Sequence, residues 1–86
     1  MDAGNYKTLS ADGLVKSGGG KLKSILCTAA SGGPSLKVWD ATSASGAVIV
    51  DTFTPVAGTN YVFGCWFSNG LYIDITNTVS VTVIYE

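Results

Sequence analysis

The stretch that decides the fold is CWFSNGLYIDI, residues 65–75. Apolar residues alternate with other residues on both sides of Asn69-Gly70, and these apolar residues are Cys65, Phe67, Leu71, Ile73 and Ile75. Asn and Gly both tolerate the positive φ that a type I′ turn requires. The stretch therefore predicts an antiparallel β-hairpin whose two-residue turn is Asn69-Gly70.

The same alternation predicts which side chains face the core. Neighbouring antiparallel strands present matching alternations to one side of a sheet. The predicted core face carries Phe63, Cys65, Phe67, Leu71, Ile73, Ile75, Val79, Val81 and Val83. Gly64 and Trp66 then point outward. A turn shifted by one residue would bury Trp66 and Tyr72 instead, and the pattern leaves this alternative open.

Most of the remaining chain also consists of short strand-forming runs between turn residues. The predicted strands cover residues 14–16, 21–30, 35–41, 47–55, 61–67, 71–76 and 79–86. Ser31-Gly32-Gly33-Pro34 is a strong breaker between two of them. No ten-residue window keeps a helical period with caps, and strands spaced in this way are typical of small sandwiches and barrels. We predict an all-β fold, a small antiparallel β-sandwich of about seven strands, over residues 13–86.

Residues 1–12 show no periodic pattern and hold two isolated apolar side chains, Tyr6 and Leu9. We interpret them as an N-terminal arm that is either disordered or ordered only against another subunit.

The composition favours an assembly of several chains. Eighty-six residues suffice for one domain. The chain is 47% hydrophobic and 13% charged, whereas soluble domains carry about 25% charged residues. A small domain with this balance leaves apolar surface uncovered, and such surface usually contacts a partner. We therefore expect an obligate assembly.

Charge and hydropathy exclude several classes of function. The net charge is −1, and the five basic residues are all lysines, so a nucleic-acid-binding surface is not expected. No apolar run approaches the ~20 residues of a membrane span. The N-terminal residues lack the features of a signal peptide, and we expect synthesis in the cytoplasm.

The sequence contains no pattern of a catalytic, metal or cofactor site. Without histidine, a Ser-His-Asp or Cys-His arrangement cannot form. Asp40, Asp51 and Asp74 are isolated along the chain and are interpreted as solvated carboxylates. Cys27 and Cys65 are interpreted as small hydrophobic residues, although a disulfide between them stays open. We expect no enzyme activity, no cofactor and no metal.

The aromatic side chains are the remaining candidates for a site. Trp39, Tyr61, Trp66 and Tyr72 could fill the core, stack against sugars or contact another subunit. Together with the two apolar residues of the arm, the predicted partner-binding residues are Tyr6, Leu9, Trp39, Trp66 and Tyr72.

Three segments carry a resemblance to a known group of proteins. They are GLVKSGGGKLKSIL (13–26), LKVWDATSASGAVIVDTFTP (36–55) and FSNGLYIDITNTVSVTVIYE (67–86). The pattern resembles small virion structural proteins of tailed bacteriophages over residues 13–86. The resemblance implies a small β-sandwich in the particle shell and supplies no functional residues.

The resemblance further implies a location and partners. The expected role is capsid decoration, as a cement protein on the capsid surface after synthesis in the host cytoplasm. The expected partners are the major capsid protein and sister subunits in a homotrimer, because threefold capsid sites favour trimers. The alternatives are a tail or head–tail component and a receptor- or carbohydrate-binding knob that uses exposed aromatic residues.

Overall fold

The structure, a computed structural model, describes residues 4–86 and is all-β in this range, as predicted. Six antiparallel strands belong to one sheet. They are β1 (Asn5–Leu9), β2 (Gly13–Ser17), β3 (Gly20–Asp40), β4 (Ala47–Phe53), β5 (Thr59–Phe67) and β6 (Gly70–Tyr85). The count differs from the predicted seven because two predicted pairs of strands are each one continuous strand, and β1 is additional.

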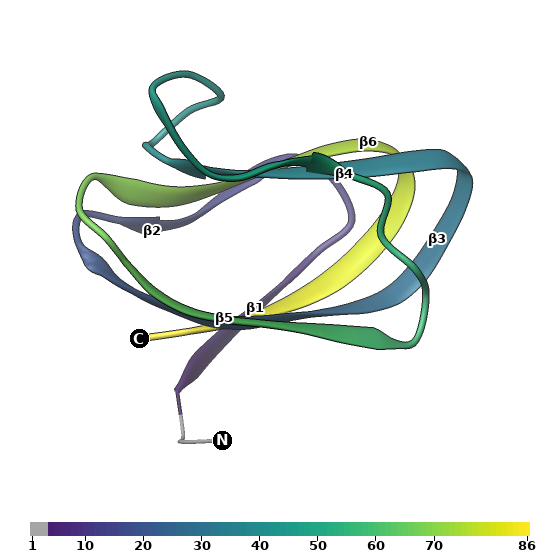
Figure 1. The fold of residues 1–86 in the computed structure, drawn as a ribbon, viewed down its shortest axis with the longest axis horizontal. Coiled ribbons are helices and arrows are strands. Elements are labelled where there is room, and N and C mark those ends of the chain that lie inside the picture. The colour runs from purple at the N-terminus through teal and green to yellow at the C-terminus, as the bar shows by residue number, and fades with distance from the viewer. Residues whose placement is uncertain (1–3) are drawn as a thin grey trace.

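The two continuous strands, β3 and β6, pair with each other along most of their length and bend together (Figure 1). The bend in β3 lies at Gly32 and Gly33, both with φ of 71°, and the bend in β6 lies at Asn77, with φ of 66°. The Asn77 side-chain amide donates a hydrogen bond of 2.7 Å to the Gly33 carbonyl. The predicted breaker at residues 31–34 therefore bends a strand and does not end it.

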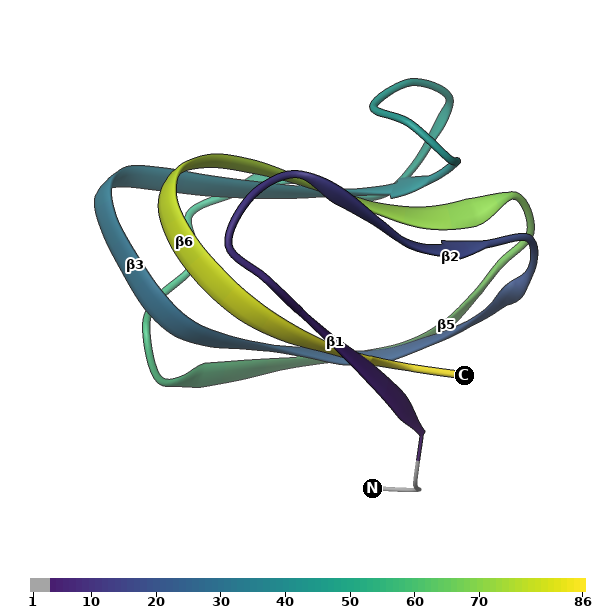
Figure 2. The same ribbon diagram turned by 180° about the vertical axis from the view of Figure 1, so that it is seen from behind.

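The bends fold the sheet back on itself into two walls that face each other (Figures 1 and 2). The β5 wall has the order β1, β6 (79–85), β3 (20–31), β5. The β4 wall has the order β2, β6 (70–76), β3 (35–40), β4. Each wall thus has four strands, and β3 and β6 are central in both.

The hydrophobic core lies between the walls and confirms the predicted alternation. Its buried residues include Leu71, Ile73, Ile75, Val79, Val81 and Val83 from β6 and Phe67 from β5. Leu22, Ile25, Cys27, Leu36 and Val38 of β3 complete it with Val15 of β2. Phe63 and Cys65 pack against this cluster. Trp66 points outward with 75% of its surface exposed, so the alternative register is wrong.

The predicted hairpin at Asn69-Gly70 is wrong. β5 pairs with β3, whereas β6 pairs with β1, β2 and β3, and the chain passes at residues 68–69 from the β5 wall to the β4 wall. Neither Asn69 nor Gly70 has a positive φ. The 70–76 half of β6 has β2 on one side and β3 on the other. No edge of this half is left for β5, and this explains why the local turn signal fails.

The N-terminal segment also differs from its interpretation. β1 pairs with β6 of the same chain, from Asn5 opposite Tyr85 to Leu9 opposite Val81. Order in residues 5–9 therefore does not require another subunit. Only Leu9 of this strand packs against the core, and Tyr6 is 73% exposed. Backbone pairing with β6 holds this strand in place, and only one of its side chains is half-buried. Its sequence therefore shows no alternation of apolar and polar residues. Residues 1–3 of the predicted arm lie outside the described residues.

Cys27 and Cys65 are both free thiols, so the disulfide alternative is not realised. Cys27 is buried in the core, as interpreted, and Cys65 is half-buried.

Substitution by aspartate should affect the stability of the fold differently on the inner and outer faces of β6. Val81→Asp and Ile73→Asp should each unfold the protein, because an unpaired charge in an apolar core costs several kcal/mol, comparable to the stability of a small domain. Ser80→Asp and Thr82→Asp, on the outer face of the same strand, should fold. Circular dichroism with thermal melting measures the difference, and equal damage from both pairs would contradict the face assignment.

The bend at Asn77 should tolerate glycine better than alanine. Asn77→Ala loses the hydrogen bond to Gly33. It also keeps the left-handed conformation with a side chain that lacks the local hydrogen bonding by which Asn tolerates it, and this conformation costs other L-residues roughly 1–2 kcal/mol. Asn77→Gly loses only the hydrogen bond and keeps the favourable backbone conformation. Urea denaturation should therefore rank stability as wild type, then Asn77→Gly, then Asn77→Ala. An alanine variant as stable as the glycine variant would show that the bend does not constrain φ.

Candidate functional site

Exposed apolar side chains gather on the outer face of the β5 wall. Large hydrophobic residues are exposed at six described positions, and four of these belong to β1, β3 and β5. The four are Tyr6, Leu26, Val62 and Trp66. Leu26 and Trp66 are chain neighbours of the core residues Ile25, Cys27 and Phe67, and therefore point away from the core. Val62 lies between Tyr61 and Phe63, which pack against the core, and Tyr6 is opposite Ile84, the neighbour of the core residue Val83, so these two also point outward. This face thus carries four of the six exposed large hydrophobic residues of the described chain.

Strand register arranges part of this face as a row across all four strands. Tyr6 pairs with Ile84, Ile84 with Ser24, and Ser24 with Val62. The next row runs from Thr8 through Thr82 and Leu26 to Asn60. The hydroxyls of Thr8 and Thr82 lie 3.5 Å apart. The two ends of the first row, Tyr6 and Val62, are 73% and 70% exposed.

Trp66 lies farther along β5, paired with Lys21 of β3. The Lys21 ammonium lies 5.7 Å from the centroid of the Trp66 ring. This distance permits a cation–π contact that leaves most of the ring accessible. The charge next to Trp66 is positive, and the row of Tyr6 and Val62 is uncharged.

A second row crosses the outer face of the β4 wall. Leu14 of β2 pairs with Tyr72 of β6, Tyr72 with Trp39 of β3, and Trp39 with Val48 of β4. Trp39 and Tyr72 are thus direct cross-strand neighbours, although thirty-three positions separate them in the chain. The row is half-buried, except for Val48, which is exposed.

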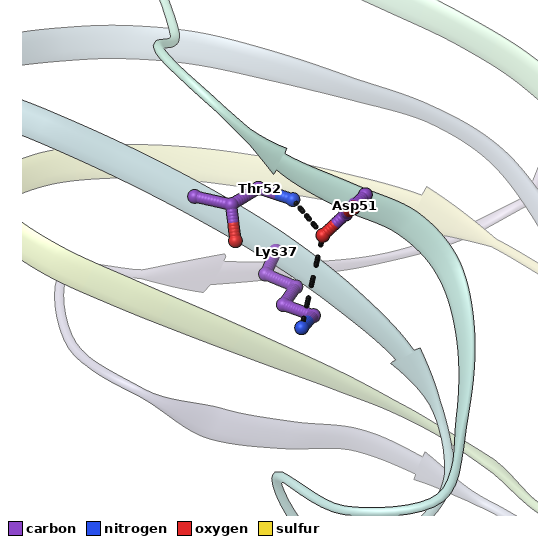
Figure 3. Close-up of polar contacts among 3 residues, drawn as sticks. All are labelled: Lys37, Asp51 and Thr52. Atoms are coloured by element: carbon purple, nitrogen blue, oxygen red, sulfur yellow. Dashed lines mark hydrogen bonds and ion pairs between the residues drawn. The ribbon is translucent and has the colours of Figure 1, made fainter.

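Lys37 lies beside this second row. Its ammonium is 4.3 Å from the centroid of the Trp39 ring and 3.7 Å from Asp51 Oδ1. Figure 3 shows Lys37 extending from β3 toward Asp51 on β4. The Oδ1 atom of Asp51 also accepts a 2.8 Å hydrogen bond from the backbone amide of Thr52. The Trp39 Nε1 atom is buried and has no hydrogen-bond partner among the described residues. The second row is therefore aromatic and flanked by charge.

The predicted site residues separate into two places and the interior. Trp39 and Tyr72 lie together on the β4 wall, and Tyr6 and Trp66 lie on the β5 wall. Leu9 packs against the core. Tyr61 also faces inward, with its ring 5.1 Å from Phe53 in an edge-to-face contact and its hydroxyl accepting a hydrogen bond from the Val56 amide. A single sugar platform of Trp39, Tyr61, Trp66 and Tyr72 is therefore not formed.

Sequence reasoning missed several members of the rows. Leu14, Val48, Val62 and Ile84 complete the rows, but each is an isolated aliphatic residue in its segment. The sequence alternation of Tyr61, Phe63 and Cys65 could have identified Val62 as an outward residue. The other three become neighbours of the aromatic residues only through pairing between distant strands.

Asp40, interpreted from the sequence as a solvated carboxylate, binds the connection between the two walls at residues 68–70. Its carboxylate accepts hydrogen bonds from the backbone amides of Ser68, Asn69 and Gly70 at 3.0, 2.8 and 3.4 Å. The bond from Asn69 is the main cause that lowers the Asp40 pKa, and burial partly opposes it. Burial, and then the nearby charge of Asp40, raise the pKa of the Cys65 thiol. Asp40 thus has a structural role.

The arrangement offers surfaces for contact. Among residues 4–86, no cluster of three or more histidine, cysteine or acidic side chains is placed to hold a metal ion. The same residues contain no helix with the length and hydropathy to cross a membrane. Comparison with family models, with curated proteins and with solved structures finds no match to this chain.

The hydrogen bonds that Asp40 accepts from the amides of residues 68–70 should make the stability of the fold depend on pH. A carboxylate whose pKa is lowered in the folded state stabilises the fold above its unfolded pKa of about 3.9, and this contribution is lost as the pH falls toward the folded pKa. Asp40→Asn should lower the thermal midpoint at pH 7, because it reduces the free energy of unfolding by about 1 kcal/mol. The difference from wild type should shrink below about pH 4. Asp74→Asn, on the same wall, is the control, and an equal loss there would contradict a special role of Asp40.

Proposed function

We propose that this chain is a non-enzymatic structural protein of a virus particle. Its role is that of a capsid decoration, or cement, protein that binds the major capsid lattice and stabilises the head. It acts as a homotrimer on the capsid surface after synthesis in the host cytoplasm. It uses no cofactor and binds neither nucleic acid nor membrane.

The observation that carries this proposal is the apolar outer face of the β5 wall. Its exposed residues, Tyr6, Leu26, Val62 and Trp66, lie on a sheet that is held rigidly by β3 and β6. An exposed apolar patch of this kind marks an interaction surface. The resemblance of residues 13–86 to small virion proteins supports the choice of a capsid as the setting.

We also infer that the folded sheet functions as a β-sandwich. Residues from the inner faces of both walls belong to one core cluster, and this supports a two-layer arrangement whose outer faces are left for partners. A decoration protein needs such a rigid unit, because many weak contacts act together at the high local concentration of a shell.

The proposal predicts a selective defect in particles. The double variant Tyr6→Ser/Trp66→Ser should keep the thermal midpoint of the isolated protein within about 2 °C, because both side chains are exposed. Its copy number per purified particle, measured by quantitative mass spectrometry, should fall at least tenfold. A control variant, Val48→Ser, alters an exposed apolar residue of β4 on the other wall and should incorporate normally. Normal incorporation of the first variant, or a position in the tail, would contradict the decoration role.

The row on the β4 wall favours a second candidate, a receptor- or carbohydrate-binding knob. Trp39 and Tyr72 are cross-strand neighbours, with Lys37 and Asp51 beside Trp39, and rings with adjacent polar groups suit sugar recognition. Titration with soluble oligosaccharides should then quench tryptophan fluorescence in wild type and in Trp66→Phe, but not in Trp39→Phe. Absence of quenching in all three proteins would exclude this candidate.

A further inference from the structure

The four edge strands of the described fold differ in how they are protected against pairing with another chain. β1, β2, β4 and β5 each pair on one side only. Charged residues discourage pairing at a free strand edge, and Lys7, Lys16 and Asp51 lie on β1, β2 and β4. Residues 52–73, which include all of β5, contain no charged residue. Among the described strands, β5 is therefore the edge without a protecting charge.

The first half of β5 also has a regular backbone. Residues 59–62 pair one by one with residues 24–27 of β3. The register shift in this pairing lies beyond them, where Gly64 has a φ of 66°. A regular strand with a free edge presents a row of backbone amides and carbonyls that an extended segment of another protein can bind. Residues 59–62 thus offer a site for an additional strand.

The side chains along this edge favour an apolar segment. Val56, Val62 and Trp66 are exposed, and they are three of the six exposed large hydrophobic residues of the described chain. Tyr61 and Phe63, on the inner side of β5, are half-buried. A strand added at this edge gives apolar neighbours to side chains on both faces of β5 and removes apolar surface from water.

An unpaired positive charge lies near the far end of this edge. The Lys21 ammonium is 5.7 Å from the centroid of the Trp66 ring, and within residues 4–86 it has no carboxylate partner. Lys23, in contrast, is paired with Glu86 at 3.1 Å. Because adjacent strands are only ~4.8 Å apart, a glutamate on an added strand can extend across the Trp66 ring to this ammonium. The charge therefore favours a segment with an acidic residue opposite Trp66.

We propose that β5 binds an extended segment of a partner protein as a fifth strand of the β5 wall. The segment is uncharged and rich in β-branched residues opposite residues 59–62, and its acidic residue contacts Lys21 across the Trp66 ring. All strand pairs of the described fold are antiparallel, and the segment continues this pattern, so that its acidic residue lies on its N-terminal side. The inference rests on the proposed function in that the segment is assigned to the major capsid protein.

Binding of synthetic peptides to the isolated full chain tests the proposal. The probe is a ten-residue peptide, blocked at both ends, in which two glutamates are followed by alternating valine and threonine. NMR titration of the isotope-labelled protein should shift the amide signals of residues 59–62. A control peptide of the same composition, with the glutamates at its C-terminal end, should bind at least threefold more weakly, because its charges lie away from Lys21.

Substitutions in the protein separate the edge from its charge. Val62→Asp should weaken binding at least tenfold, because it places a carboxylate in the middle of the pairing site. Val48→Asp adds the same charge to an exposed position of β4 on the other wall and should bind the probe as wild type does. Lys21→Glu should prefer a probe in which lysines replace the two glutamates. Circular dichroism checks that all three variants are folded.

Three outcomes overturn the inference. They are the absence of shifts at residues 59–62 at millimolar probe, equal affinity of wild type for the two peptides, and equal affinity of Val62→Asp and Val48→Asp for the probe. Incorporation into particles is measured separately. A protein that binds the probe but does not enter particles contradicts the decoration role alone, and one that enters particles without binding the probe contradicts only the pairing at β5.

Discussion

The pairing of β3 with β6 is the constraint on which the rest of the structure depends. These two strands lie at the centre of both walls, and all other strands attach to one of them. They can serve both walls only because they bend at the same level, where glycines and Asn77 adopt left-handed conformations. The hydrogen bond from Asn77 to Gly33 joins the two bends. Loss of this joint bend would leave two half-walls without a shared core.

The central position of β3 and β6 also determines which strands are free. β1, β2, β4 and β5 each pair on one side only, within the described residues, and are thus the edges of the two walls. Of these, β1 and β5 border the outer face that carries most of the exposed apolar surface. Free strand edges and exposed apolar residues are therefore combined on one wall.

The two outer faces differ chemically, and this difference suggests a division of roles. The β5 wall carries exposed aliphatic and aromatic residues, with Lys21 beside Trp66 and the Lys23–Glu86 ion pair near Ile84. The β4 wall carries a half-buried aromatic pair between charged groups, with the Lys37–Asp51 ion pair alongside. Apolar surface associates without strong directional demands, whereas charged and aromatic groups select a partner by geometry.

The sequence by itself determined the fold class and favoured the inward residues of β6, whereas the outward position of Trp66 was decided by the structure. Alternation with a period of two follows from strand geometry and survives in any arrangement of strands. Only the tertiary structure decided which strands pair. A turn signal such as Asn69-Gly70 shows that the chain can change direction, but β2 and β3 already pair with both sides of the 70–76 half of β6, so β5 pairs with β3. Likewise, residues 31–34 bend β3 because the continuous partner β6 holds the strand on both sides of the breaker. The aromatic row of Trp39 and Tyr72 has the same origin, since pairing between distant segments depends on competition for strand edges, which no local pattern records.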